Sequence, residues 1–140
     1  MDSVFLFLYM LEDQFYKIQT FAEQPMTGEP TGYRATVTLN PAHAVFGGHF
    51  PGNPVVPGVC QVQMVKELLE KATGCSLRLT ASDNIKFLSM IDPTVHSKLE
   101  FTITVKDASP GTYSATAQVA AEGTVFLKFK GQFERENGWL

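Results

Sequence analysis

Residues 48–59 read GHFPGNPVVPGV, with prolines at positions 51, 54 and 57 and a histidine, His49, before the first of them. Each proline fixes its own φ near −65° and biases the residue before it toward extended geometry. The segment therefore predicts a stiff loop that has little conformational entropy left to lose. Such a loop can hold His49 in one position, close to where a helix begins.

A long helix is predicted directly after this loop, from the Pro57-Gly58 pair to about Thr73, with Gly74 as its stop signal. Gly58 places no side chain at the helix start, so the first backbone N–H groups can face a ligand. At 100° per residue, one arc of the helix is apolar and is expected to face a sheet: Val59, Val62, Val65, Leu68, Leu69 and Ala72. The opposite side carries Gln63, Lys66, Glu67 and Glu70.

Four segments alternate apolar and polar residues with period two, as strands with one buried face do: 33–39, 99–105, 113–121 and 125–133. A further strand is expected over 77–88, ended by Ile91-Asp92-Pro93. Short turns at 109–111 and 122–123 would join the last three strands into an antiparallel meander. One helix among five or six antiparallel strands predicts an α+β domain in which a curved sheet wraps the helix.

The length of 140 residues and the globular composition fit a single domain over residues 1–140. A net charge of −3 provides no basic field for a phosphate backbone, so no nucleic-acid partner is expected. The apolar run from Val4 to Leu11 is shorter than the roughly 20 residues of a membrane span and lacks the cationic start of a signal peptide. We expect no membrane anchor. Because Met10 could be a second start, residues 1–9 are either an extra N-terminal segment or an apolar lead-in.

The remaining reactive side chains suggest packing and surface roles. Cys60 and Cys75 lie at opposite ends of the predicted helix, too far apart for a disulfide and without metal-binding spacing, so we expect reduced thiols and a cytoplasmic location. Cys60 lies in the first helical turn, where a thiolate is stabilised, but without a base nearby in the sequence we expect it to be buried in packing. Structural, surface, turn or edge roles are expected for His43, His96, Asp83 and Asp92.

The opening stretch resembles the active-site segment of the hotdog-fold 3-hydroxyacyl-(acyl carrier protein) dehydratases, G-H-F-P-x-x-P-x-x-P-G-V followed by the central helix. Every fixed position is matched, by Gly48, His49, Phe50, Pro51, Pro54, Pro57, Gly58 and Val59. A weaker likeness continues through SDNIKFLSMIDP, residues 82–93, and the strand meander, so the resemblance covers about residues 30–135. It implies a hotdog fold, a curved antiparallel sheet around one long central helix.

The resemblance also implies a site. His49 would be the base that removes the C2 proton beside a thioester carbonyl, and the substrate-binding residues would be Phe50, Pro57, Gly58 and Val59. It further implies a homodimer with sheets joined edge to edge, possible higher assemblies of dimers, an acyl carrier protein or coenzyme A thioester as substrate, and no metal or organic cofactor. In the family a carboxylate on the partner's central helix, fourteen residues after the histidine, helps the 3-hydroxyl to leave; that position here is Gln63.

Gln63 departs from that pattern because an amide has no proton to release near neutral pH. Loss of a general acid typically costs about 10²–10⁴ in rate unless another group replaces it. The candidates are Glu67, one turn further along, and a water held by Gln63. However, Glu67 precedes Lys71 by four residues and Lys66 precedes Glu70 by four, the spacing of a solvated helix face. We therefore expect Glu67 to be exposed to solvent rather than catalytic.

Three functions remain open. The first is dehydration of a 3-hydroxyacyl group on an acyl carrier protein, in fatty-acid or related lipid metabolism. The second is non-catalytic binding of an acyl thioester or acyl carrier protein, with Gln63 marking lost chemistry. The third is thioester hydrolysis on the same fold.

Overall fold

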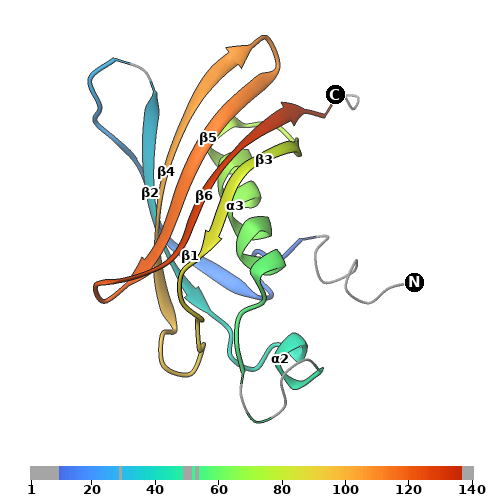
Figure 1. The fold of residues 1–140 in the computed structure, drawn as a ribbon. Coiled ribbons are helices and arrows are strands. Elements are labelled where there is room, and N and C mark those ends of the chain that lie inside the picture. The colour runs from blue at the N-terminus through green and yellow to red at the C-terminus, as the bar shows by residue number, and fades with distance from the viewer. Residues whose placement is uncertain (1–9, 29, 49–51, 53, 137–140) are drawn as a thin grey trace.

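The computed structural model describes residues 10–28, 30–48, 52 and 54–136. They form a six-stranded sheet whose neighbouring strands are all antiparallel, in the order β1-β2-β4-β5-β6-β3. The strands are β1 (Tyr16–Gln24), β2 (Thr31–Leu39), β3 (Leu77–Phe87), β4 (Lys98–Ser109), β5 (Thr112–Ala121) and β6 (Thr124–Arg135). The helices of the described part are α2 (Ala44–Gly48) and α3 (Gly58–Thr73). Figure 1 shows the sheet curving around α3, which confirms the predicted α+β architecture.

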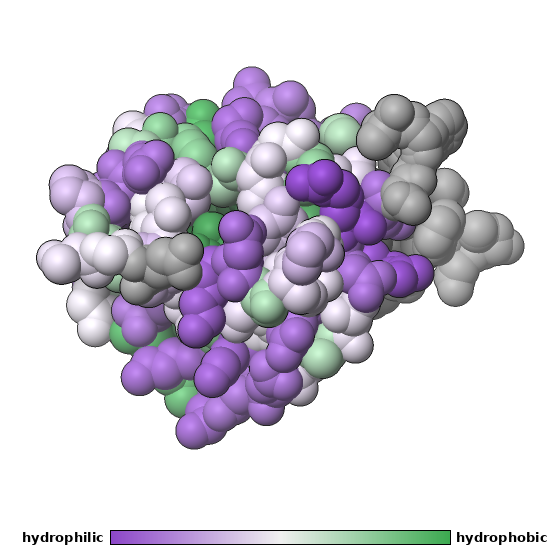
Figure 2. Space-filling view, turned by 90° about the horizontal axis from the view of Figure 1, so that it is seen from above, coloured by the Kyte–Doolittle hydropathy of each residue, from purple (hydrophilic) through white to green (hydrophobic). Residues whose placement is uncertain are grey.

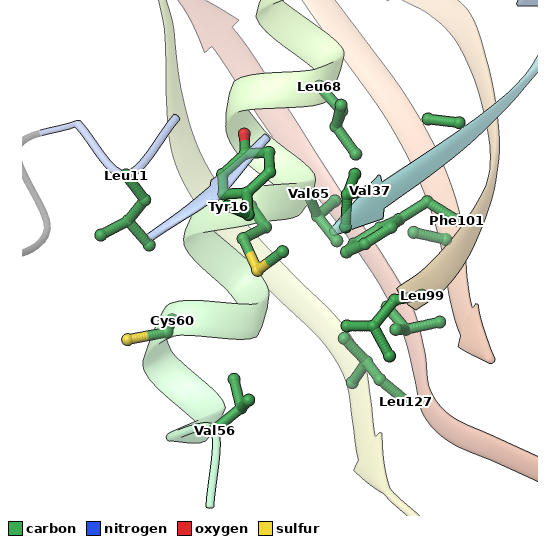
Figure 3. Packing of buried hydrophobic residues seen from close by; sticks show 14 of the residues in the cluster. Leu11, Tyr16, Val37, Val56, Cys60, Val65, Leu68, Leu99, Phe101 and Leu127 are labelled. Atoms are coloured by element: carbon green, nitrogen blue, oxygen red, sulfur yellow. The ribbon is translucent and has the colours of Figure 1, made fainter. Parts of the chain in front are cut away.

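Helix α3 has the predicted limits. Gly74 follows it in the left-handed conformation, with φ of 74°, and donates its N–H to the carbonyl of Glu70 at 2.8 Å. On the side that faces the sheet, Val65 and Leu68 are fully buried and point toward Phe101 of β4 (Figure 3). The sheet and helix therefore enclose one apolar core.

The predicted polar and apolar sides of α3 are only partly correct. Val59, assigned to the buried arc, is 51% exposed, whereas Gln61 and Glu67 are buried. The expectation of an exposed Glu67 is therefore wrong. The reason is that residues 11–16 pack against a second side of the helix; Figure 3 shows Leu11 beside α3, on the side away from the sheet.

The five predicted strands are confirmed as β2 to β6, and β4, β5 and β6 form the predicted meander. Gly111 and Gly123 supply positive φ values of 79° and 83° at its two turns. Strand β1 was not predicted, because a register shift between Ile18 and Thr20 interrupts the two-residue period. Helix α2 was also missed, since five residues are too few to show a helical period.

One face of the molecule is mostly polar (Figure 2). The face seen in Figure 2 carries mostly hydrophilic residues with small apolar patches among them. Large apolar side chains are exposed where β3, an edge strand, ends and where α3 begins: Val59 (51%), Phe87 (50%), Leu88 (51%) and Met90 (76%). Within the described ranges, none of the helices has the length and apolar content needed to cross a membrane.

Candidate functional site

The loop that leads into α3 is anchored to the β3–β4 connection. Val56 is buried and donates its N–H to the carbonyl of Ile91 at 2.9 Å; Ile91 is fully buried. This contact fixes the point from which the helix starts. His49 and Phe50 lie outside the described residues, so their assigned roles stay predictions.

The N-terminus of α3 has no side-chain cap. Pro57 occupies the N-cap position with φ of −59° and ψ of 145°, and the first turn contains no acidic residue. Cys60 and Gln61 donate their N–H groups to the carbonyl of Pro57 at 3.0 and 3.2 Å. The N–H groups of Gly58 and Val59 precede the first intrahelical donors, at the end of the helix that carries about half a positive charge. This end therefore carries a partial positive charge that no side chain caps.

Gly58 allows an aromatic ring to approach the helix start. A Cβ atom at this position would lie 2.7 Å from Cζ of Phe87, closer than real Cβ atoms come. The Phe87 ring, at the end of β3, therefore forms one apolar wall beside the helix N-terminus. Sequence reasoning found the glycine but not its aromatic neighbour.

Further along the helix, Gln63 and Glu67 are joined. Nε2 of Gln63 donates to Oε2 of Glu67 at 2.9 Å, and the same oxygen accepts the N–H of Leu11 at 2.7 Å. The other oxygen, Oε1, accepts the N–H of Glu12 at 2.9 Å and the hydroxyl of Tyr16 at 2.8 Å. Each carboxylate oxygen thus has two donors, which explains how a charged side chain is tolerated in a buried position.

These hydrogen bonds indicate whether Glu67 can serve as the general acid in place of Gln63. Glu67 lies within hydrogen-bond distance of Gln63, but a proton on either of its oxygens would displace one of its donors. The geometry therefore suits Glu67 to holding its neighbours in place rather than to giving up a proton. Tyr16 stays a donor, since burial and the charge of Glu67 raise the pKa of its hydroxyl far above the ordinary value of 10.

The raised pKa of Tyr16 predicts an alkaline loss of stability. The folded state favours the neutral phenol, so this contribution is complete below about pH 10 and is lost as the pH rises further, by up to about 1.4 kcal/mol per pH unit. Tyr16→Phe lacks this titration, and its deficit in unfolding free energy relative to wild type should shrink above pH 10. Urea unfolding at pH 8, 10 and 11 measures the deficit; a constant value would contradict the prediction.

The other titratable residues have structural surroundings. Cys60 is buried, as predicted, and burial together with the charge of Glu67 raises the pKa of its thiol to about 11. Nδ1 of His43 accepts the N–H of Val45 at 3.1 Å. The ring of His96 packs edge-on against Phe126 and lies beside a cavity of about 580 Å³ that includes neither Gln63 nor the start of α3. In the described part of the chain, no three His, Cys, Asp or Glu residues group closely enough to hold a metal ion.

The acidic residues given turn or edge roles behave as expected. Oδ1 of Asp92 accepts hydrogen bonds from the N–H of Thr94 at 2.9 Å and from the hydroxyl of Thr94 at 2.6 Å. These two bonds close the turn after β3. Asp83 is exposed on β3 at a register shift between Ser82 and Asn84. Both lie outside the Gln63–Glu67 pair and its hydrogen-bond partners.

Sequence reasoning missed Tyr16 and the burial of Glu67, together with a buried amide on the same helix. Gln61 is only 3% exposed; its Nε2 donates to the carbonyl of Val56 at 3.3 Å, and its Oε1 has no partner among the described residues. The position of Glu67 one turn after Gln63 made it a candidate in the sequence, but its charge spacing favoured an exposed role. Nothing local showed that residues 11–16 would cover it.

The chain is similar to known dehydratases in sequence. A family model described as ApeI-like, ApeI dehydratase, matches residues 25–125. The 3-hydroxyacyl-[acyl-carrier-protein] dehydratase FabZ of Lactococcus lactis is 33% identical over 100 residues, which cover 66% of this chain and 65% of that protein. The match thus spans slightly less than two thirds of this relative's length.

Solved structures show the same fold. The dehydratase heterocomplex ApeI:P from Xenorhabdus doucetiae superposes with a TM-score of 0.60 at 18% identity, over 85% of this chain and 97% of that one. A candidate thioesterase from Lactococcus lactis gives a TM-score of 0.59 at 8% identity, over 99% and 100% of the two chains. These likenesses confirm the hotdog fold. Because the family model spans 25–125, well over half of the sequence, this chain belongs to the ApeI-like dehydratase family.

Proposed function

We propose that this protein acts on 3-hydroxyacyl thioesters carried by an acyl carrier protein or coenzyme A, and dehydrates them to 2-enoyl thioesters in fatty-acid or related lipid biosynthesis. The observation that carries the proposal is the uncapped start of α3 at Gly58, which directly follows the proline loop of the matched motif. The FabZ relative, whose name states this reaction, supports the choice of substrate.

In the proposed reaction, His49 removes the C2 proton, and the N–H groups of Gly58 and Val59 stabilise the enolate oxygen that develops at the thioester carbonyl. The C3–O bond then breaks and the hydroxyl leaves as water. Gln63 can hold this hydroxyl but cannot protonate it, so the proton comes from the imidazolium of His49 or from a water held by Gln63. The reaction needs no metal or organic cofactor.

A second candidate function is binding without turnover, and Gln63 is the observation that favours it. An amide in place of a general acid retains the shape and hydrogen bonding of a binding site while removing a proton source. Such a protein would bind acyl thioesters or an acyl carrier protein without releasing enoyl product.

The proposal includes assembly as a homodimer, in which His49 of one protomer faces Gln63 of its partner. The unpaired outer edge of β3 and the exposed apolar side chains Phe87, Leu88 and Met90 support an edge-to-edge contact there. The Xenorhabdus relative forms a heterocomplex, so light scattering with and without a second dehydratase chain distinguishes the two assemblies. A monomer under both conditions would contradict the assembly.

The two thiols, Cys60 and Cys75, are free, which suits the proposed cytoplasmic location.

The test is turnover of 3-hydroxyacyl thioesters of several chain lengths on both carriers, followed by the ultraviolet absorbance of the enoyl product. His49→Ala should reduce the rate to the uncatalysed level, whereas the control His96→Ala, at the separate cavity, should leave it unchanged. If wild type and His49→Ala are equally inert but bind a non-reactive analogue, the binding function holds instead. Release of free thiol without enoyl product would identify a thioesterase.

A further inference from the structure

The orientation of the Gln63 carboxamide is set by its neighbour. A carboxamide has a donor end and an acceptor end of nearly equal shape, and a half turn exchanges them. Oε2 of Glu67, 2.9 Å away, can only accept, so the NH₂ group of Gln63 must face it. The carbonyl oxygen of Gln63 is therefore on the other side of the amide, turned away from Glu67.

Glu67 is itself held so that it cannot follow a rotation of Gln63. Two backbone N–H groups, from Leu11 and Glu12, and the hydroxyl of Tyr16 fix both carboxylate oxygens. Tyr16 and Leu11 are each 1% exposed, so solvent does not compete for the donors of these two residues. The orientation of the Gln63 amide thus depends on the hydrogen bonds that residues 11, 12 and 16 donate to Glu67.

We propose that Glu67 is a positioning residue that presents the carbonyl oxygen of Gln63 to the substrate, so that the site selects acyl thioesters whose C3 substituent donates a hydrogen bond. This rests on the proposed function, which places the substrate's C3 group at Gln63. A 3-hydroxyl can donate to the carbonyl oxygen, whereas a 3-oxo group has only acceptor atoms and would face it oxygen to oxygen. The site therefore prefers 3-hydroxyacyl over 3-oxoacyl thioesters.

The test compares the dissociation constants of non-hydrolysable 3-hydroxyacyl and 3-oxoacyl pantetheine analogues by calorimetry. Wild type should prefer the 3-hydroxy analogue by at least about tenfold. Glu67→Gln, which lets the amide rotate, should reduce this preference to about threefold or less. Glu70→Gln is the matched control: it makes the same change on the same helix, where Glu70 accepts the N–H of Leu77 at 2.9 Å and does not touch Gln63. It should keep the wild-type preference.

A second variant covers the case in which Glu67→Gln does not fold. Glu67→Asp keeps the charge but withdraws the carboxylate from Gln63 by one methylene, and should also lower the preference. In wild type, the side-chain NH₂ signal of Gln63 in a ¹H–¹⁵N spectrum should exchange slowly with solvent, and in either variant it should exchange faster.

The outcomes separate the two proposals. An unchanged preference in folded Glu67→Gln or Glu67→Asp, with turnover intact, would overturn the role of Glu67 alone. A preference that behaves as expected in a protein without turnover would support the role of Glu67 and overturn dehydration. Binding of neither analogue by wild type would overturn both.

Discussion

Gln63→Glu is expected to raise the rate of dehydration by about 10²–10⁴-fold, the usual contribution of a well-placed general acid. The introduced carboxyl group would lie within hydrogen-bond distance of Glu67, since the amide nitrogen it replaces is 2.9 Å from Oε2. Two carboxylates at this distance cannot both be ionised, so they share a proton and the apparent pKa of one step is raised. The variant thereby gains an acidic proton at position 63, which the amide of Gln63 cannot supply.

The pH dependence tests this explanation. Because the protonated form is the active one, the gain should be largest at low pH and should fall as the pH rises through the raised pKa. Turnover of a 3-hydroxyacyl thioester between pH 5.5 and 8.5 measures it, with Gln63→Leu as a control of similar size that has no proton and should show no gain. A folded Gln63→Glu variant that binds substrate but is no faster than wild type would show that position 63 does not reach the leaving hydroxyl.

Glu67→Ala is expected to lower the free energy of unfolding by about 3–5 kcal/mol, the usual cost of removing one partner from a buried charged network. The change would leave the N–H groups of Leu11 and Glu12 and the hydroxyl of Tyr16 without their acceptor. Each unpaired buried donor costs about 1–3 kcal/mol, and a water entering the space would recover part of this. Since a whole domain is stable by only about 5–15 kcal/mol, the variant should unfold at a much lower denaturant concentration.

Chemical denaturation followed by circular dichroism, at one fixed protein concentration, measures this loss. Glu70→Ala is the control: its ion pair with Lys66, at 3.1 Å, is about one quarter exposed on both sides and is worth little. We expect that variant to lose about 1–2 kcal/mol, mainly through the unpaired N–H of Leu77. Equal losses in the two variants would mean that the network around Glu67 adds nothing beyond an ordinary surface contact.

The parts of the fold that depend on residues close together in the sequence could be predicted from it. The limits of α3 follow from Pro57 and Gly74, whose backbone preferences act locally. The five strands from β2 to β6 follow from their alternating residues, because each has one face toward the core. The expected pair between Lys66 and Glu70 is also present.

The burial of Glu67 could not be predicted in this way. Its partners Leu11, Glu12 and Tyr16 are 56, 55 and 51 residues away in the sequence, whereas the charge spacing on α3 reports only on the helix itself. The same limit applies to Phe87, which is 29 residues from Gly58 in the sequence and lies beside it at the end of β3. The sequence could indicate candidate residues for the chemistry, but the partners that orient Gln63 and Glu67 depend on contacts between distant segments.

Two of the four donors to Glu67 are main-chain groups, which every residue type except proline supplies. Residue 12 can therefore be substituted during evolution without loss of its hydrogen bond to Glu67, and residue 11 needs only to remain apolar. Proline at either place would delete a donor outright. In descendants of this gene, Tyr16 and Glu67 should accordingly be inherited or lost as a pair, while the identity of residue 12, apart from proline, carries little information.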